Sequence, residues 1–304
     1  MPTITLPHGT VDYRHAGPTE PAAAGGAPPV VFVHGVLVGA SLWTATADAL
    51  ADAGVCSFAP DLPLGAHRRP VGPTADQSPR GVARQVLAFL EALDLHDVTL
   101  VGNDSGGAIS QYVIDTDPAR IGRLVLTNCD AFEQFPPPRL NRFMTLLRHP
   151  VALAIAGVAM RSTRIRHGRL GFGPFANRYD TAVTRSWIEP LGNRNIRRNV
   201  SRLARAVDPA DLAAVGARLR HFDRPVRLVW GTTDPFFTLD LARRLLTAFP
   251  DAELVEVPGA RTFVPLDAPE RLAAEIVTIS RSVRSDRPDR ADPKGQLARD
   301  RAGT

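Results

Sequence analysis

The segment from Val98 to Gly107 limits the fold more than any other part of the sequence. It begins with an apolar run, Val98–Val101, which predicts a buried strand, and it continues through glycines and short polar residues into a helical stretch. A strand that enters a helix through so short a turn forces the central residue into a strained backbone conformation. Only small residues two positions before and two positions after that central residue avoid a clash. The segment therefore predicts a sharp strand-to-helix turn with one side chain at its apex.

The small residues of this turn decide which side chain stands at the apex. Gly102 and Gly106 fit the two small positions and place Asp104 between them. Ser105 at the apex would require Asn103 at the first small position, which is a poorer fit. A glycine-rich turn with a helix-capping aspartate is the interpretation without chemistry, because aspartate is a favoured helix cap. We predict Asp104 at the apex.

The rest of the chain alternates between apolar, β-rich runs and amphipathic helical stretches, a pattern that predicts a mostly parallel sheet flanked by helices. The expected strands are 4–6, 10–15, 30–33, 55–59, 98–101, 124–127, 226–230 and 254–257. The expected helices are 41–53, one that begins at Ser78 and Pro79, one that ends near Asp117, 239–249 and 269–280. This is the pattern of an α/β fold.

The alternation stops between residues 131 and 215, where helical pieces and arginines replace the strands. We therefore expect a core made of residues 1–130 and 216–280, with a helical cap inserted at 131–215. Residues 281–304 are rich in arginine and aspartate and almost free of large apolar side chains, so we expect a disordered tail there.

Composition excludes several classes of protein. Hydrophobic residues make up 44% of the 304 residues, which suffices for a core. Only two cysteines, Cys56 and Cys129, are present, so a disulfide scaffold and a structural metal site are not expected. The longest apolar run, Val151–Met160, is too short to span a bilayer, and the amino end lacks a signal pattern. We expect this run to form a lid helix that is buried against the core or lines a substrate tunnel. We expect a cytoplasmic protein without stable membrane insertion.

The basic charge is almost entirely arginine and is unevenly distributed. Of the 36 basic residues, 35 are arginine, and no nucleic-acid-reading motif accompanies them, so we expect no nucleic acid partner. Residues 131–215 hold 14 arginines against five acidic residues. The simpler interpretation is a solvated lid, and the sharper one is an electrostatic funnel for an anionic substrate.

Two further motifs accompany the turn at Asp104. His34-Gly35-Val36 follows the strand at 30–33, and Asp234 follows the strand at 226–230. With these motifs the chain resembles the cap-bearing branch of the α/β-hydrolase superfamily, over about residues 1–280. An aspartate at the turn resembles the haloalkane dehalogenases and epoxide hydrolases. The resemblance implies an oxyanion hole formed by the backbone N–H groups of Val36 and Ser105.

The resemblance also implies a mechanism. Asp104 attacks a carbon atom to form an ester with the enzyme, and a histidine held by an acid then activates water. The acid corresponds to Asp234. The position of the histidine corresponds to Thr262, and no histidine follows His221. Threonine cannot take a proton from water near pH 7, so the sequence lacks the catalytic base that the family has at this position.

Other positions also depart from these two families. In haloalkane dehalogenases the halide is typically held by a tryptophan directly after the nucleophile and by an amide side chain directly after His-Gly. In this chain Ser105 and Val36 occupy these two positions. Epoxide hydrolases use two cap tyrosines, whereas the inserted region has only Tyr179. Four further residues are weaker candidates, the first three as substitute bases and the last as a second acid: His67, His149, His167 and Asp130.

The remaining candidates concern the pocket. We expect His34 to shape the oxyanion loop beside the substrate. The other expected substrate-binding side chains are Tyr179, Trp230, Phe236 and Phe237. The resulting prediction is an enzyme that hydrolyses a small, largely apolar organic substrate without a cofactor. One alternative is a lyase, isomerase or cyclase that uses Asp104 as an acid or base, and another is a ligand-binding protein without catalysis. The sequence does not indicate the oligomeric state.

Overall fold

The structure is a computed structural model that describes residues 1–18 and 27–281. Its last described element is α12 (Pro269–Arg281). Arg281, the first residue of the predicted tail, therefore ends a helix, and the remainder of that tail lies outside the described residues.

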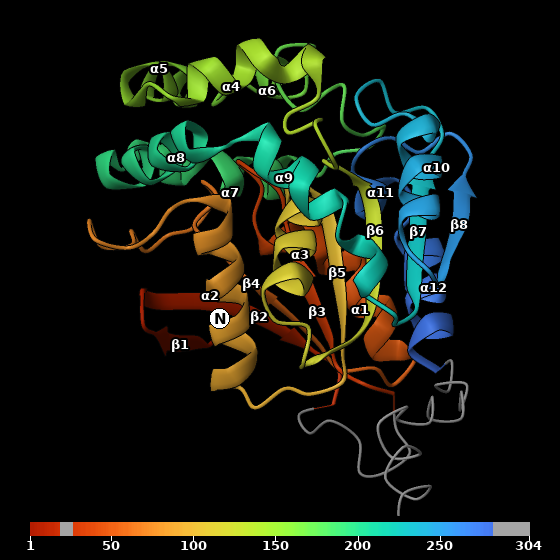
Figure 1. Cartoon of the computed structure of the whole chain (residues 1–304). Helices are drawn as coiled ribbons and strands as arrows, with labels where there is room; N and C mark the ends of the chain where they lie inside the picture. The colour runs from red at the N-terminus through yellow and green to blue at the C-terminus, as the bar shows by residue number, and fades with distance from the viewer. Residues whose placement is uncertain (19–26, 282–304) are drawn as a thin grey trace, which may run out of the picture.

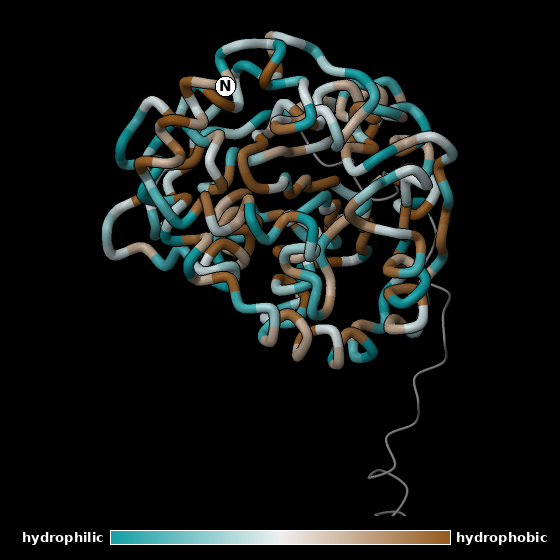
Figure 2. Tube along the Cα trace, turned by 90° about the horizontal axis from the view of Figure 1, so that it is seen from above, coloured by the Kyte–Doolittle hydropathy of each residue, from teal (hydrophilic) through white to brown (hydrophobic). Residues whose placement is uncertain are grey.

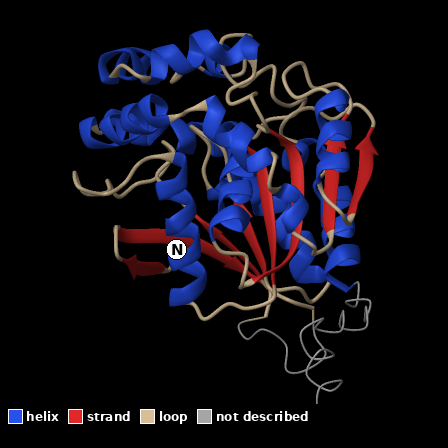
Figure 3. Ribbon diagram, viewed as in Figure 1, coloured by secondary structure: helices blue, strands red, loops and turns tan. Residues whose placement is uncertain are grey.

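The centre of the molecule is an eight-stranded sheet with the strand order β1-β2-β4-β3-β5-β6-β7-β8. Strand β2 runs antiparallel to both β1 and β4, and all other neighbouring strands are parallel. The strands are β1 (Thr3–Leu6), β2 (Gly9–Ala16), β3 (Val30–Val33), β4 (Ser57–Pro60), β5 (Val98–Asp104), β6 (Ile121–Cys129), β7 (Val226–Gly231) and β8 (Ala252–Val257). This mostly parallel sheet confirms the predicted fold class (Figures 1 and 3).

Helices cover both faces of the sheet. On one face α1 (Thr44–Asp52) packs against α12, and on the other α2 (Pro79–Ala92) packs against α3 (Ser105–Thr116) (Figure 1). α10 (Leu239–Ala248) lies beside β7 and β8. The α2 helix begins as the sequence predicts, because Ser78 accepts a hydrogen bond from the N–H of Gly81 and proline occupies the first position.

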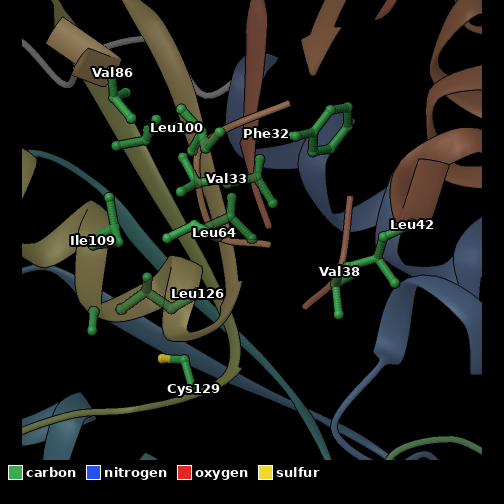
Figure 4. Packing of buried hydrophobic residues seen from close by; sticks show 14 of the residues in the cluster. Phe32, Val33, Val38, Leu42, Leu64, Val86, Leu100, Ile109, Leu126 and Cys129 are labelled. Atoms are coloured by element: carbon green, nitrogen blue, oxygen red, sulfur yellow. The ribbon is translucent and has the colours of Figure 1, made fainter. Parts of the chain in front are cut away.

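The core follows from this layering. Strands that are covered on both faces need apolar side chains on both faces, which explains the continuous apolar runs of β3 and β5. Val33 and Leu100 are fully buried beside Val86 of α2 and Ile109 of α3 (Figure 4). Phe32, which is also fully buried, points to the other side of the sheet, where its ring stacks on that of Trp43 with centroids 4.6 Å apart. Seen from above, apolar stretches of the chain run through the interior and polar stretches are frequent at the rim (Figure 2).

Between β6 and β7 the chain forms helices and turns and no strand. The α-helices are α4 (Asn141–Leu147), α5 (Pro150–Ala159), α6 (Thr163–Arg166), α7 (Thr181–Ile188), α8 (Arg194–Ala206) and α9 (Pro209–Gly216). α4, α5 and α6 lie along the upper edge in Figure 1, and α7 and α8 lie between them and the sheet. In the part of the chain that the structure describes, no helix is long and apolar enough to cross a membrane.

The apolar helix α5 differs from its expected place. The sequence suggested a lid helix buried against the core or lining a tunnel. The helix packs instead on α4, on α8 and on the short turn η3 (Glu189–Gly192), all of which belong to the inserted region. Because α8 stands between α5 and the sheet, α5 does not reach the core, and its opposite side faces solvent.

Candidate active site

Asp104 forms the apex of the turn between β5 and α3, at the carboxyl edge of the sheet, where ligands bind in open α/β folds. Its backbone has φ 55° and ψ −132°. A positive φ is rare for a residue with a side chain and is maintained only where the surrounding structure imposes it. Asp104 is therefore held in a strained conformation, whereas Ser105 begins the helix.

The neighbouring glycines are required by close approach. A Cβ atom on Gly106 would lie 2.1 Å from the carbonyl oxygen of Val33. A Cβ atom on Gly102 would lie 2.6 Å from the hydroxyl of Ser110. A Cβ atom on Gly35 would lie 2.1 Å from Oδ2 of Asp104 itself, so the loop after β3 touches the carboxylate directly. These contacts fix where the carboxylate can lie.

The carboxyl group of Asp104 titrates far above its usual range. Its pKa is raised to about 7, mainly by burial and in part by the charge of Asp234, against the opposing effect of a hydrogen bond from the backbone of Ser105. Only 7% of the residue is exposed. A carboxyl with such a pKa is present in both the protonated and the ionised form near neutral pH.

Asp234 is held by three donors. Its Oδ1 accepts from the N–H groups of Phe236 at 2.8 Å and Phe237 at 3.2 Å. Its Oδ2 accepts from the side-chain amide of Asn128 at 2.8 Å. Burial raises the pKa of Asp234 to about 6 in spite of these bonds. The amide of Asn128 thus bonds the oxygen Oδ2 of the predicted acid.

Asn128 was missed by the sequence analysis. Its side chain also joins Gly231, accepting from that N–H at 2.6 Å and donating to that carbonyl at 3.1 Å. A polar residue near the end of β6, after the apolar run at 124–126, was the one available signal. Its partners lie more than 100 residues away, and no local pattern identifies them.

Thr262 lies beside both carboxylates. The side-chain amide of Asn103, next to Asp104, donates to the backbone carbonyl of Thr262 at 2.6 Å. The Thr262 hydroxyl lowers the pKa of Asp234, although the two groups do not meet the geometry of a hydrogen bond. The residue is wholly buried, and its hydroxyl has no hydrogen-bond partner among the described residues. The loop of Thr262 thus joins the turn of Asp104 to the acid Asp234, and it carries no base.

The predicted oxyanion donors are the backbone N–H groups of Val36 and Ser105. The N–H of Ser105 lies at the start of α3 and bonds to the Asp104 carboxylate. No described residue accepts a hydrogen bond from the N–H of Val36. The next residue, Leu37, has φ 59° and donates to the carbonyl of Leu64 at 2.9 Å, which fixes the loop.

Asp130 adds a third buried carboxyl group. It follows β6, is 2% exposed, and its Oδ1 has no partner among the described residues. Burial raises its pKa well above the usual value, the charge of Asp104 adds to the rise, and the Ser105 hydroxyl opposes it. The site therefore concentrates acidic groups in a poorly solvated region.

The core histidines are occupied by structural bonds. In His34, Nε2 accepts from the N–H of Leu62 at 3.0 Å, so Nδ1 carries the proton and lies 3.0 Å from the carbonyl of Gly35. In His67, Nδ1 accepts from the N–H of Gly65 at 3.2 Å, and Nε2 lies 3.4 Å from Oδ1 of Asn199. Burial lowers the pKa of both histidines to about 4. Both are neutral links between loops.

The candidate residues of the cap have local roles. His167 bonds the hydroxyl of Thr184 at 2.8 Å and stacks on Tyr179. The hydroxyl of Tyr179 donates to the carbonyl of Phe172 and accepts from the N–H of Ala176 at 2.7 Å. His149 precedes α5 on the outer side of the cap and is exposed.

The predicted pocket aromatics differ in accessibility. Trp230 and Phe237 are wholly buried, and the indole N–H of Trp230 donates to the carbonyl of Phe237 at 2.9 Å. Phe236 is half-buried and packs on Phe175 of the cap, with ring centroids 4.7 Å apart. Phe236 alone of these three therefore retains a partly accessible ring.

The cap is fastened to the loop that carries Thr262. The N–H of Phe263 donates to the carbonyl of Phe175 at 2.8 Å, and the two rings stack. Asn177 donates to the carboxylate of Asp267 through its N–H at 2.7 Å and its side-chain amide at 3.0 Å. Phe175 of the inserted region thus contacts the loop of Thr262 and the loop of Asp234. Over the described ranges, no group of three metal-ligating side chains could hold an ion.

Two kinds of known hydrolase are similar to this chain in sequence. The sequence is similar to haloalkane dehalogenase 2 of Mycobacterium tuberculosis, with 28% identity over 269 residues, 83% of this chain and 88% of the relative. It is 25% identical over 233 residues to 2-hydroxy-6-oxononadienedioate/2-hydroxy-6-oxononatrienedioate hydrolase 1 of Dechloromonas aromatica, covering 74% of this chain and 77% of the relative.

Solved structures show the same fold. The epoxide hydrolase CorEH superposes with a TM-score of 0.72 at 18% identity, covering 91% of this chain and 96% of its own. The enol-lactonase of Burkholderia xenovorans superposes with a TM-score of 0.70 at 17% identity, covering 91% and 99%. A family model described as the alpha/beta hydrolase family matches residues 30–275. The chain therefore belongs to the α/β hydrolase family.

Proposed function

We propose that the protein is an enzyme in which the carboxylate of Asp104 attacks a small, largely apolar organic substrate. The observation that carries this proposal is the strained backbone of Asp104, which presents a buried carboxylate between the loop of Gly35 and the start of α3. The aromatic pair Phe175 and Phe236 beside the site supports an apolar substrate. In this proposal residues 131–215 act as a cap that closes over the reacting atoms.

The first step forms a bond between an Asp104 oxygen and an electrophilic carbon of the substrate. The bond from that carbon to its halogen or oxygen breaks, and the leaving atom takes the electron pair. Hydrolysis then requires water to attack the carboxyl carbon of the ester, with the resulting oxyanion held by the N–H groups of Val36 and Ser105. Since Thr262 supplies no base, we infer that this second step is slow and that the ester accumulates.

A second function is favoured by the pKa of Asp104. A carboxyl group with a pKa of about 7 can both give and accept a proton at neutral pH, which suits a general acid or base. In this alternative Asp104 moves a proton within the substrate in an isomerase or lyase reaction and forms no covalent bond. The two functions differ in whether Asp104 gains mass during the reaction.

The test is incubation of the whole chain with simple epoxides, haloalkanes and activated esters, followed by intact mass measurement and peptide mapping. We expect the peptide that contains Asp104 to gain one alkyl group from a haloalkane, one acyl group from an ester, or the whole mass of an opened epoxide. The Asp104→Asn variant should gain none of these. The rate of labelling should rise with pH through about 7, because only the ionised carboxyl is nucleophilic. No adduct with any of these reagents, together with an Asp104-dependent proton exchange, would establish the acid–base alternative instead.

Gly35→Ala should reduce labelling of Asp104 by about a hundredfold, because a shift of about 1 Å in a reacting group has an effect of that size. The added Cβ atom would lie 2.1 Å from Oδ2 and 2.8 Å from the Cβ of Asp104, so the carboxylate must move. Gly72→Ala is the matched control, since a Cβ atom there meets nothing within 4 Å. Equal labelling rates in both variants would show that the carboxylate does not react from this position.

A further inference from the structure

Exposed apolar side chains are concentrated in one part of the cap. Apart from Met1, every large apolar side chain that is exposed among the described residues lies between residues 143 and 170. These side chains are Phe143, Leu146, Val151, Ile155, Val158, Ile165 and Leu170. They belong to α4, α5, α6 and the turn that follows, along the upper edge of the molecule in Figure 1. We call residues 139–170 the outer cap surface.

The helix α5 is the centre of this surface. Its sequence, from Pro150 to Ala159, contains no polar side chain at all. A helix that is apolar on every side is normally buried on every side. In α5 only the side that carries Leu153 and Gly157 is buried. The opposite stripe is left open, with Val151 73%, Ile155 68% and Val158 62% exposed.

The charges of the outer cap surface are all of one sign. Residues 139–170 contain seven arginines and no aspartate or glutamate. Six of these arginines are exposed and form no ion pair with any described residue. They are Arg139, Arg142, Arg148, Arg161, Arg164 and Arg169. Elsewhere in the cap an exposed arginine can be paired, as Arg185 is with Glu189.

A cavity next to the exposed stripe of α5 is also rich in arginine. A cavity of about 420 Å³ lies beside α5 and shares Val158 with the exposed stripe. Four arginines and a single carboxylate line it, namely Arg161, Arg166, Arg185, Arg197 and Glu189. Arg166 is only 1% exposed, and its guanidinium donates to backbone carbonyls and threonine hydroxyls rather than to a carboxylate. The cavity therefore adds to the attraction for anions at this surface.

We propose that the outer cap surface binds the face of an anionic phospholipid bilayer. Apolar side chains flanked by arginines without acidic residues are what an interfacial helix needs to enter the headgroup region. A second copy of the chain is a poor occupant, because two such surfaces would place like charges together. The ten residues of α5 are too few to span a bilayer, so the helix lies in the plane of the interface. The proposal does not depend on the reaction of Asp104.

The test is sedimentation of the full chain with vesicles of two compositions. We expect binding to vesicles of phosphatidylcholine mixed with phosphatidylglycerol, little binding to phosphatidylcholine alone, and weaker binding as salt is raised. Arg161→Gln with Arg164→Gln should lower the partition coefficient about tenfold or more, since each arginine near an anionic surface contributes about fivefold. Ile155→Ser with Val158→Ser should lower it similarly by removing the apolar contact.

The control removes the same charge elsewhere. Arg220 and Arg281 are exposed, and they lie just before β7 and at the end of α12, at the end of the sheet opposite the cap. Arg220→Gln with Arg281→Gln should bind like the unmodified chain, and all variants should keep the same thermal midpoint because the changed side chains are exposed. Binding lost equally in the control, binding unaffected by the serine changes, or no binding to anionic vesicles would each overturn the proposal.

Discussion

Replacing Thr262 by histidine is expected to accelerate hydrolysis of the Asp104 ester by about a hundredfold, the low end of what general-base catalysis contributes. Thr262 stands beside Asp234, and its backbone is bonded to Asn103, next to the reacting carboxylate. An imidazole there could donate one N–H to Asp234 and accept a proton from water with its other nitrogen. The buried threonine hydroxyl, which has no partner in the described structure, leaves no existing bond to be broken.

The measurement isolates this one step. The chain is first labelled on Asp104, the excess reagent is removed, and loss of the label is followed by mass spectrometry. Thr262→Gln is the matched control, because glutamine approaches histidine in size but has no basic nitrogen. The site is wholly buried, and a larger side chain in a packed site costs about 1–3 kcal/mol, so folding is checked by circular dichroism. Equal rates for the histidine and glutamine variants would show that a missing base is not what limits hydrolysis.

Failure of this experiment is distinguishable from failure of the proposed function. If Asp104 is never labelled, the nucleophile itself is wrong, and the Thr262 variants cannot be compared by this method. If Asp104 is labelled and the histidine variant retains the label, Asp104 is the nucleophile, but a histidine at position 262 is not placed to act as the base. The label must also be absent in Asp104→Asn, which excludes reaction at another carboxyl group such as Asp130.

The fold could be predicted because its signals are local. The strand-to-helix turn at Asp104 needs glycines within two residues on either side, and these stand in the sequence. The predicted strands agree with the observed ones to within a few residues, since buried parallel strands read as continuous apolar runs. The largest differences are at β5 and β6, which extend to Asp104 and Cys129.

The surroundings of the site could not be predicted in the same way. Asn128 bonds Asp234 across 106 residues, and Asn103 bonds Thr262 across 159 residues. Such contacts depend on which strands become neighbours. The exposure of α5 could not be predicted either. An apolar run in a sequence predicts a buried helix, but it does not show which elements cover that helix in the fold. His34, named as a pocket residue, bonds two backbone groups through its ring, which spacing alone does not reveal.

Asp104→Asn is expected to stabilise the folded protein by about 2–4 kcal/mol at pH 8 and to leave its stability nearly unchanged at pH 4. Burial raises the pKa of Asp104 to about 7 in the folded chain, whereas an unfolded aspartate titrates near its usual value of 3.8. Between these two values the folded state binds more protons than the unfolded state, so stability falls as pH rises. Above about pH 7 the Asp104 carboxyl is ionised in the folded protein, and the whole destabilisation caused by burying its negative charge is then present.

Asparagine has nearly the shape of a protonated aspartate, which explains the pH dependence of the expected effect. At pH 4 it replaces a group that is already neutral in the folded state, and at pH 8 it removes a charge. Asp130 and Asp234 shift in the same direction, so both proteins lose stability with rising pH. The difference between the two proteins reports the charge of Asp104 together with its effect on these acidic neighbours. Urea unfolding at pH 4, 6 and 8 measures that difference.

The control is Asp223→Asn, an exposed aspartate that forms no ion pair with any described residue. Its stability should stay within about 0.5 kcal/mol of the unmodified chain at each pH, as for most surface substitutions. A stabilisation by Asp104→Asn that is the same at pH 4 and pH 8 would mean that the charge is not its cause. A pH-dependent stabilisation, joined to complete loss of labelling, would mean that the charge which makes Asp104 reactive is also a charge that the fold holds at the expense of its own stability.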